Sequence, residues 1–257
     1  MNILEKLYAF YDEFDHGKGY IGFTEKGKPI PYFCLGKSDY PVVLIQYAIH
    51  AREYITTHLA LEQIKDFYKN GKRGRIYFIP AVNIDGIEIA LTKNPLYKAN
   101  ANRVDLNVNF DARWGEGQSN VFSPADENYV GEYPFSESES KALRDFTLYV
   151  RPDVTISYHS KGEEIYWEFF QTGKKRERDF LLAQKLGKAT GYNVKQTLGS
   201  SGGYKDWCIE KLGIPSFTIE VGSDLLSHPI KETELDSIYK KNKEVINVIT
   251  ENFSYER

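Results

Sequence analysis

Apolar residues in this chain occur both as short continuous runs and as longer stretches with helical spacing. The continuous runs predict buried strands, because a strand covered on both faces carries apolar side chains at nearly every position. Four such strands are expected, at 42–45, 75–80, 154–159 and 217–221. Helical spacing predicts helices at 3–14, 54–64, 137–149, 174–187 and 232–253. In the helix at 137–149, Ser136 is the expected N-cap and Glu139 stands at capping-box spacing.

The alternation of strands and helices predicts an α/β fold. We expect a mixed, mostly parallel twisted sheet with helices on both faces. The chain has 257 residues, a length at which α/β proteins commonly form one domain. No linker rich in proline, glycine or serine, internal repeat or low-complexity tract divides the sequence. A single domain over residues 1–257 is therefore expected.

Residues able to bind a metal stand at the ends of these predicted strands. His50 and Glu53 follow the first strand, and His159 ends the third. Residues three apart in a helical turn project from the same side, so His50 and Glu53 can bind one ion if a helix starts near Ala51. Open α/β sheets usually place their sites at the carboxyl ends of strands. Two imidazoles and one carboxylate, with a fourth position for water, suit catalytic zinc.

A lone carboxylate, Glu220, lies inside the apolar strand at 217–221. A short H-x-x-E pattern often occurs by chance, and a histidine after a strand is more often a hydrogen-bonded structural residue than a ligand. Glu220 is harder to explain structurally, because an unpaired buried carboxylate is costly and usually raises its own pKa. Such a group is a candidate for function.

Further segments match those of the zinc carboxypeptidase family, and they occur in the same order. They are Pro80–Gly86, Tyr97–Asn100, Val104–Asn107, Gly131–Glu137 and Ser201–Trp207. Together with the residues above, the match extends over residues 40 to 222. The chain therefore resembles this family, which implies a zinc-dependent hydrolase of peptide or isopeptide bonds.

The resemblance implies one Zn²⁺ per chain and assigns three ligands: His50, Glu53 and His159. It also implies that Glu220 is the general base and that Asp105 holds a ligand imidazole in its metal-binding tautomer. Lys98 stands where the family usually has an arginine or lysine that stabilises the developing oxyanion, although a surface lysine is the alternative. Arg52 is expected to face bound substrate.

The chain departs from the family at Val108. Where the family usually reads D-L-N-R-N-F, the segment Asp105–Phe110 reads D-L-N-V-N-F. The missing arginine would grip the terminal α-carboxylate of a substrate, and valine cannot donate the required bidentate hydrogen bonds. In addition, Leu198 replaces a mobile tyrosine of the digestive members. Ordinary carboxypeptidase activity is therefore not expected.

Other residues near these segments are candidates for binding substrate. Lys205 occupies the position that in related enzymes lies in the pocket beyond the cleaved bond, so it would favour an acidic group there. Arg113 is a second cation close in sequence to the lost arginine. The paired glycines before Tyr204 suit a substrate-facing loop, and Asn107 belongs to the altered segment. Solvated surface residues and a plain strand-to-helix turn are the alternatives.

Two segments, 107–115 and 159–167, look like a bacterial branch of the family, the γ-D-glutamyl-diaminopimelate peptidases. The implied substrate is a murein stem peptide of the cell wall, which carries several carboxylates around an isopeptide bond. Three alternatives remain open: a metallocarboxypeptidase, an amidase or deacylase acting on another small carboxylate-bearing substrate, and a zinc-binding module without catalysis. Glu220 argues against the last of these.

Net charge and the lengths of the apolar runs limit which partners and which cellular location are expected. The net charge of −3, with both signs mixed along the chain, gives no reason to expect nucleic acid or an anionic membrane as a partner. The first residues form too short an apolar run for a secretory signal, and no stretch reaches the length of a membrane span. A cytoplasmic location is therefore expected. The oligomeric state does not follow from the sequence.

Overall fold

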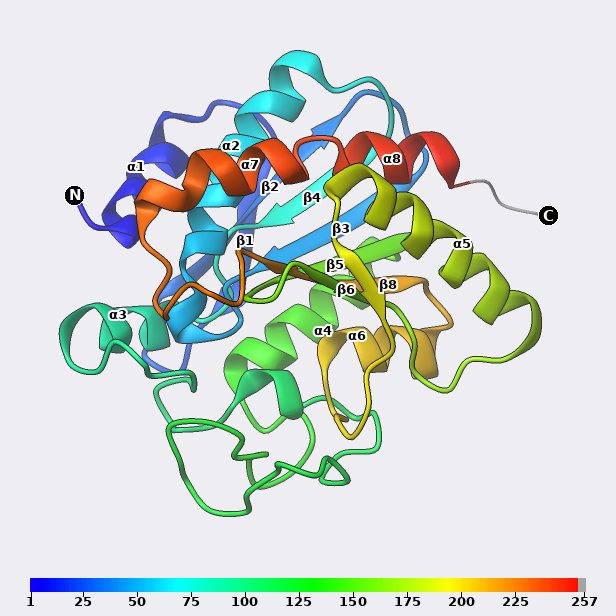
Figure 1. The fold of residues 1–257 in the computed structure, drawn as a ribbon. Helices are drawn as coiled ribbons and strands as arrows, with labels where there is room; N and C mark the ends of the chain where they lie inside the picture. Colours follow the sequence, from blue (N-terminus) through cyan, green and yellow to red (C-terminus); the bar gives the residue numbers. More distant parts are fainter. Residues whose placement is uncertain (254–257) are drawn as a thin grey trace.

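Eight strands form one mixed sheet in the computed structural model, which describes residues 1–253 (Figure 1). Its centre consists of four parallel strands: β4 (Arg75–Ile79), β3 (Val42–Tyr47), β5 (Val154–Ser160) and β8 (Ser216–Val221). These are the four strands that the continuous apolar runs predict. Most of their side chains are buried, as expected for strands covered on both faces.

Four further strands extend the sheet at its two edges. They are β1 (Lys18–Phe23), β2 (Pro29–Gly36), β6 (Glu164–Tyr166) and β7 (Asn193–Lys195). The complete order is β1-β2-β4-β3-β5-β8-β6-β7, and β2 and β6 run antiparallel to their central neighbours. The sequence does not predict these strands, because β2 contains two prolines and β6 and β7 are only three residues long.

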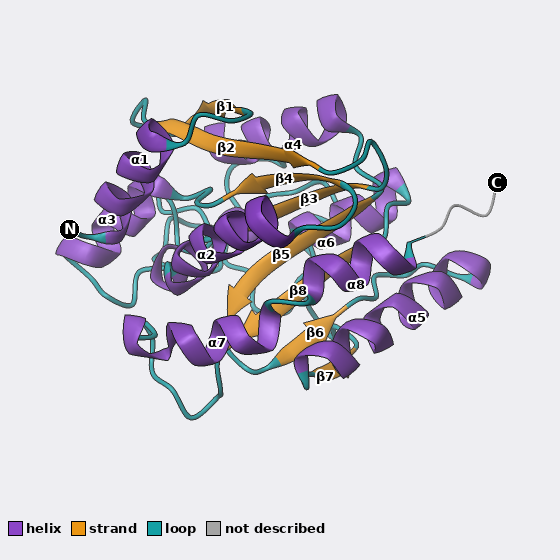
Figure 2. Ribbon diagram, turned by 90° about the horizontal axis from the view of Figure 1, so that it is seen from above, coloured by secondary structure: helices purple, strands orange, loops and turns teal. Residues whose placement is uncertain are grey.

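Helices cover both faces of the sheet, and the fold is α/β as expected (Figure 2). One face carries α1 (Ile3–Glu13), α2 (Ile55–Asn70), α5 (Gly173–Thr190), α7 (Leu235–Asn242) and α8 (Val245–Asn252). The other face carries α4 (Ser138–Val150) and α6 (Tyr204–Trp207), which continues into a π-helical turn, Cys208–Leu212. The short helix α3 (Ile84–Thr92) packs against the turn Ala51–Glu53. None of the helices within residues 1–253 is long and apolar enough to cross a membrane.

The prediction of one continuous C-terminal helix at 232–253 is wrong, because the structure has a 3₁₀ turn and two helices there. A 3₁₀ turn at Glu232–Glu234 precedes α7, and the two-residue turn Lys243–Glu244 separates α7 from α8 although both residues keep right-handed helical dihedral angles. The backbone carbonyl of Asn242 accepts a hydrogen bond from the Gln63 side chain at 3.2 Å, and the helix is interrupted directly after this residue. A side chain remote in sequence therefore accompanies the break.

The predicted N-cap of α4 is also wrong. The helix begins at Ser138, and Glu137 takes the N-cap position. The Ser136 hydroxyl instead donates to the Glu137 carboxylate at 2.6 Å. Glu139 does not close a capping box, because its carboxylate accepts hydrogen bonds from Asn100 and from the backbone of a distant loop. Tertiary contacts thus replace the local pattern.

A buried hydrogen-bonded group joins the two strands at the centre of the sheet. Tyr47 of β3 and Tyr158 of β5 are register partners, and their rings stack with centroids 5.0 Å apart. The Tyr47 hydroxyl donates to Gln63 Oε1 at 2.6 Å, and Gln63 Nε2 donates to the Tyr158 hydroxyl at 3.1 Å. All three residues are buried. One amide side chain from α2 thus satisfies both phenols.

We predict that Gln63→Leu lowers the free energy of unfolding by about 2–4 kcal/mol, because it leaves polar groups buried without partners. Denaturant-induced unfolding followed by circular dichroism measures this change. The matched control is Glu62→Gln on the exposed side of the same helix, for which a change within about 0.5 kcal/mol is expected. Equal stability of the two variants would contradict the importance of this group.

Candidate active site

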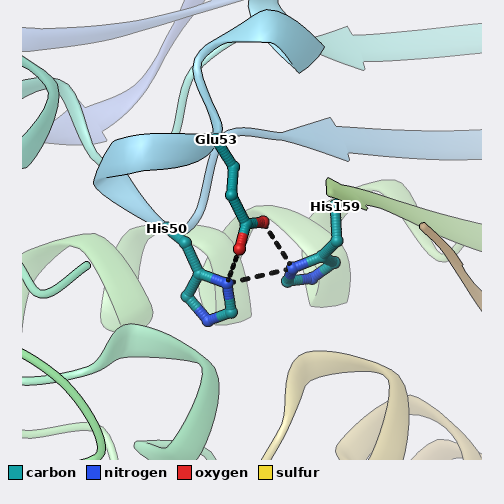
Figure 3. Close-up of side chains that lie close together, drawn as sticks. All are labelled: His50, Glu53 and His159. Atoms are coloured by element: carbon teal, nitrogen blue, oxygen red, sulfur yellow. Dashed lines mark hydrogen bonds and ion pairs between the residues drawn. The ribbon is translucent and has the colours of Figure 1, made fainter. Parts of the chain in front are cut away.

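Three side chains converge at the carboxyl ends of β3 and β5 (Figure 3). His50 follows β3, Glu53 ends the 3₁₀ turn Ala51–Glu53, and His159 lies near the end of β5. Glu53 Oε1 lies 2.8 Å from His50 Nδ1, and Glu53 Oε2 lies 3.0 Å from His159 Nδ1. All three residues are buried. The spacing of the motif thus brings two distant segments to one point.

The turn that carries these residues differs from the expected helix start. A 3₁₀ turn occupies Ala51–Glu53, and α2 begins only at Ile55. In a 3₁₀ turn, residues three apart project from the same side, so His50 and Glu53 still face one another. The helix expected at 54–64 begins one residue later, at Ile55, and the 3₁₀ turn at Ala51 provides the arrangement of His50 and Glu53.

This group fits a metal ion. The ligand atoms of His50, Glu53 and His159 lie within 4.8 Å of one another, and the two Nδ1 atoms are 3.1 Å apart. Two imidazole nitrogens and a carboxylate directed at one point are the ligands that zinc binds, and three protein ligands leave zinc a further position for water. Burial would raise the pKa of Glu53, but both histidines outweigh it and hold this pKa well below its usual range. The carboxylate is therefore charged, as a ligand must be.

Asp105 connects this group to the long segment between α3 and α4. Its Oδ1 lies 3.2 Å from His50 Nε2, and its Oδ2 lies 2.7 Å from Lys98 Nζ. Burial acts to raise the pKa of Asp105, yet Lys98 and His50 hold it well below its usual range. A carboxylate against Nε2 orients the ring so that Nδ1 faces the metal position. The geometry agrees with the positioning role expected for Asp105.

Glu220 stands beside the ligands on the neighbouring strand. It pairs in register with His159, and such partners project from the same face of a sheet. Burial raises the pKa of Glu220 to about 8; His159 opposes this rise and Glu53 adds to it. A carboxylate with a pKa near neutrality is suited to accept and return a proton. The expected pKa shift of this strand glutamate is thus present.

A cleft of about 320 Å³ opens beside His50. Amide and hydroxyl side chains contribute most of its polar lining, and the lining residues include Lys98, Asn107, Val108, Asn128 and Leu198. Lys98 and Asn107 therefore lie near a ligand, as predicted, and Val108 occupies the cleft wall. Asn128 was not predicted: its backbone N–H donates to Asp105, and its side chain accepts from Lys98 at 3.3 Å.

A larger hollow of about 730 Å³ lies between the loop 225–232 and the N-terminal residues, but no metal-ligand residue lines it. The convergence of metal-binding side chains, and not the volume of a hollow, therefore identifies the site.

A second acidic group consists of Glu25, Glu137 and Glu139. Asn100 donates to Glu137 at 2.8 Å and to Glu139 at 3.2 Å, and backbone N–H groups satisfy Glu25 and Glu139. This group thus anchors the loop that carries Lys98.

Comparison with known proteins identifies the family. The model of the zinc carboxypeptidase family matches residues 18–245. The chain belongs to this family. It is therefore a zinc metallopeptidase, a hydrolase that uses one zinc ion, and His50, Glu53 and His159 form the group that can hold it. The family expected from the sequence motifs is confirmed.

The chain is similar to peptidases and to an amidase. It is 28% identical to γ-D-glutamyl-L-diamino acid endopeptidase 1 of Lysinibacillus sphaericus, over 94% of this chain and 68% of that protein. It resembles bovine thrombin-activatable fibrinolysis inhibitor, solved with tick carboxypeptidase inhibitor, with a TM-score of 0.85, 25% identity and coverage of 96% and 95% of the two chains. Murein-tripeptide amidase of Escherichia coli O157 shares the fold, with a TM-score of 0.67, 23% identity and 97% coverage of both chains.

Two predicted substrate contacts, Tyr204 and Lys205, are buried and do not line the cleft beside His50, so their contact with substrate stays a prediction. Tyr204 is fully buried, and its hydroxyl shares a hydrogen bond with Thr147 at 2.9 Å, so it belongs to the core. Lys205 is only 5% exposed. Its Nζ lies 2.6 Å from Asp206 Oδ1 and donates to the Glu168 carbonyl at 2.9 Å. The charge of Lys205 is therefore neutralised inside the protein and is not presented to the cleft.

Arg113 does not line the cleft beside His50 either, and its predicted contact with substrate stays a prediction. Its guanidinium stacks over the Phe170 ring at 3.6 Å, and its Nε lies 3.4 Å from Glu210 Oε1. It lines a separate surface hollow and not the cleft beside His50. Arg52, by contrast, adjoins Glu53 in the turn, with Nη1 3.3 Å from Glu127 Oε2. Its contact with substrate stays a prediction.

We predict that Asp105→Asn weakens zinc binding by roughly tenfold to a hundredfold, because the ligand imidazole loses its orienting charge. Competition with a chromogenic chelator measures the affinity. Asp85→Asn is the matched control, since Asp85 is buried and lies 3.2 Å from Lys28 Nζ but makes no hydrogen bond or ion pair with His50, Glu53 or His159. Zinc affinity should be unchanged in this control, and an equal loss in both variants would refute a specific role for Asp105.

Proposed function

We propose that this zinc metallopeptidase hydrolyses the γ-D-glutamyl-diaminopimelate bond of murein stem peptides. The observation that carries the proposal is the cleft wall at Val108, which borders the same space as His50 and Lys98. A valine cannot grip the terminal α-carboxylate on which ordinary carboxypeptidase activity depends. Lys98 does not replace the missing arginine, since a lysine ammonium lacks the planar guanidinium that binds a carboxylate through two parallel hydrogen bonds.

Similarity to a relative named for the same type of bond supports this choice. The relative from Lysinibacillus sphaericus is named for cleavage of γ-D-glutamyl-L-diamino acid bonds, and the similarity extends over 94% of this chain. The polar part of the cleft consists largely of neutral amides and hydroxyls, including Asn107, Gln118 and Asn128. Such groups donate hydrogen bonds to carboxylates and accept them from ammonium groups, so they suit the mixed charges of diaminopimelate.

The proposed reaction assigns a task to each residue. Zinc, when bound, supplies a Lewis acid that activates water and polarises the scissile carbonyl. Glu220 accepts a proton from the attacking water and later returns it to the leaving nitrogen. Lys98 places a positive charge near the developing oxyanion, while Asp105 fixes both Lys98 and His50. Asn107 contacts the leaving half of the substrate. The cytoplasmic location expected from the sequence stays a prediction.

Product analysis tests the choice of substrate. With defined stem peptides, mass spectrometry should detect release of the diaminopimelate-containing fragment, and a chelator should abolish it. Panels of ordinary C-terminal peptides and of small acylated amino acids run in parallel. Faster cleavage of either panel would replace the proposed substrate by that of a carboxypeptidase or of an amidase or deacylase.

The role of Glu220 is tested by Glu220→Gln. We expect kcat to fall by about a thousandfold or more because the variant cannot accept a proton, while zinc content stays at one ion per chain. Glu163→Gln is the control, since Glu163 pairs with Lys241 and is not part of the proposed machinery. Full activity of Glu220→Gln would rule out the assigned base.

A further inference from the structure

Lys161 lies next to the metal ligands but does not line the cleft beside His50. It follows β5 directly, two residues after His159. The backbone N–H of the intervening Ser160 donates to Glu53 Oε2 at 3.2 Å. This hydrogen bond fixes the backbone next to Lys161 to a metal ligand. The direction of the Lys161 side chain therefore affects which substrate groups can bind beside the metal.

The ammonium of Lys161 extends towards the loop that follows Glu220. Lys161 Nζ donates to the backbone carbonyl of Asp224 at 2.7 Å and lies 3.7 Å from Asp224 Oδ1. A further hydrogen bond, from Gly162 N–H to the Gly222 carbonyl at 2.8 Å, joins the two loops. The Asp224 side chain is 72% exposed, so its ion pair with Lys161 is weak and easily exchanged.

Two further polar groups on this side have buried atoms without hydrogen-bond partners within residues 1–253: Nε of Arg52 and Nδ1 of His228. Burial lowers the pKa of His228; Glu53 opposes this, and Arg52 and Lys161 add to it. Arg52 precedes Glu53 directly in the chain, and Lys161 follows Ser160, whose backbone N–H donates to the same glutamate. Buried polar atoms usually have partners, so unpaired ones beside an active site indicate a place for a polar ligand.

The leaving half and the acyl half of the proposed substrate carry different charged groups, so each needs different contacts from the protein. In the proposed reaction, the cleft with Val108 and Asn107 receives the leaving diaminopimelate. Arg52 and Lys161 do not line that cleft, although Arg52 adjoins Glu53 and Lys161 follows His159 by two residues. We assign these two cations to the acyl half. A γ-linked glutamyl residue keeps its α-carboxylate free on this half, whereas an ordinary peptide has a neutral amide there. A cation on the acyl side would therefore discriminate between the two linkages.

We propose that Lys161, together with Arg52, binds the free α-carboxylate of the glutamyl residue on the acyl side of the scissile bond. This inference rests on the proposed function and explains how the enzyme selects a γ-linkage. Without substrate, the loop at Asp224 holds the ammonium in place. The substrate carboxylate exchanges with the exposed Asp224 side chain, so that one ion pair replaces another.

The test compares two stem tripeptides that differ in one group. One carries the free α-carboxylate of the D-glutamyl residue, and the other carries the α-carboxamide. For the unaltered enzyme, kcat/KM should favour the acid by about tenfold or more, the scale of one charge-assisted hydrogen bond. Lys161→Met should lower this ratio several-fold, chiefly by slowing cleavage of the acid, because only Arg52 then remains to bind the carboxylate, and Lys161→Arg should keep the ratio. Lys240→Met is the control, because Lys240 is 68% exposed and pairs with Asp236 on α7.

Each outcome decides a different question. An unchanged ratio in a Lys161→Met variant with normal zinc content and thermal stability would overturn the role of Lys161. Equal rates on both tripeptides with the unaltered enzyme would also overturn it, while leaving the proposed function standing. If the unaltered enzyme cleaves neither tripeptide but cleaves another substrate panel, the proposed function fails, and this inference fails with it. If Lys161→Met does not fold, Lys161→Gln gives the same comparison.

Discussion

The ion pair between Asp105 and Lys98 is the interaction on which the site depends. Asp105 is fully buried, and an isolated carboxylate in that position would be very unfavourable. Lys98 at 2.7 Å and His50 at 3.2 Å keep it charged, and the charge in turn orients the imidazole. Because Asp105 also accepts the backbone N–H of Asn128, the loop that forms the cleft is fixed to the ligand-bearing sheet. Metal site and substrate cleft are therefore held by one carboxylate.

The four central strands could be predicted because their burial on both faces requires continuous runs of apolar residues in the sequence. A strand covered on both faces must be apolar throughout, as in β3 and β5, so its run of residues is visible without any partner. The edge strands lack this trace, and their pairing depends on neighbours distant in sequence. The break between α7 and α8 likewise involves Gln63 of α2, which no local pattern around Asn242 reveals.

The candidate site divides in the same way. His50, Glu53 and His159 could be found because each stands at the end of a visible strand, and strand ends meet at one edge of the sheet. Side-chain direction is not encoded so simply. Lys205 follows a recognisable loop but turns to the adjacent Asp206, and Arg113 turns to an aromatic ring far along the chain. The position of these two cations close to a motif in the sequence therefore does not reveal which groups their side chains contact.

The stacked pair of Tyr47 and Tyr158 has a consequence for how the enzyme becomes active. The second of these tyrosines immediately precedes His159, so the two side chains point to opposite faces of β5. A slip of one residue between β3 and β5 would exchange these faces, and the imidazole would enter the apolar layer under α2. The tyrosine pair thus couples the register of β3 and β5 to the metal site. A chain that pairs these strands out of register loses the stacked tyrosines and the metal site together.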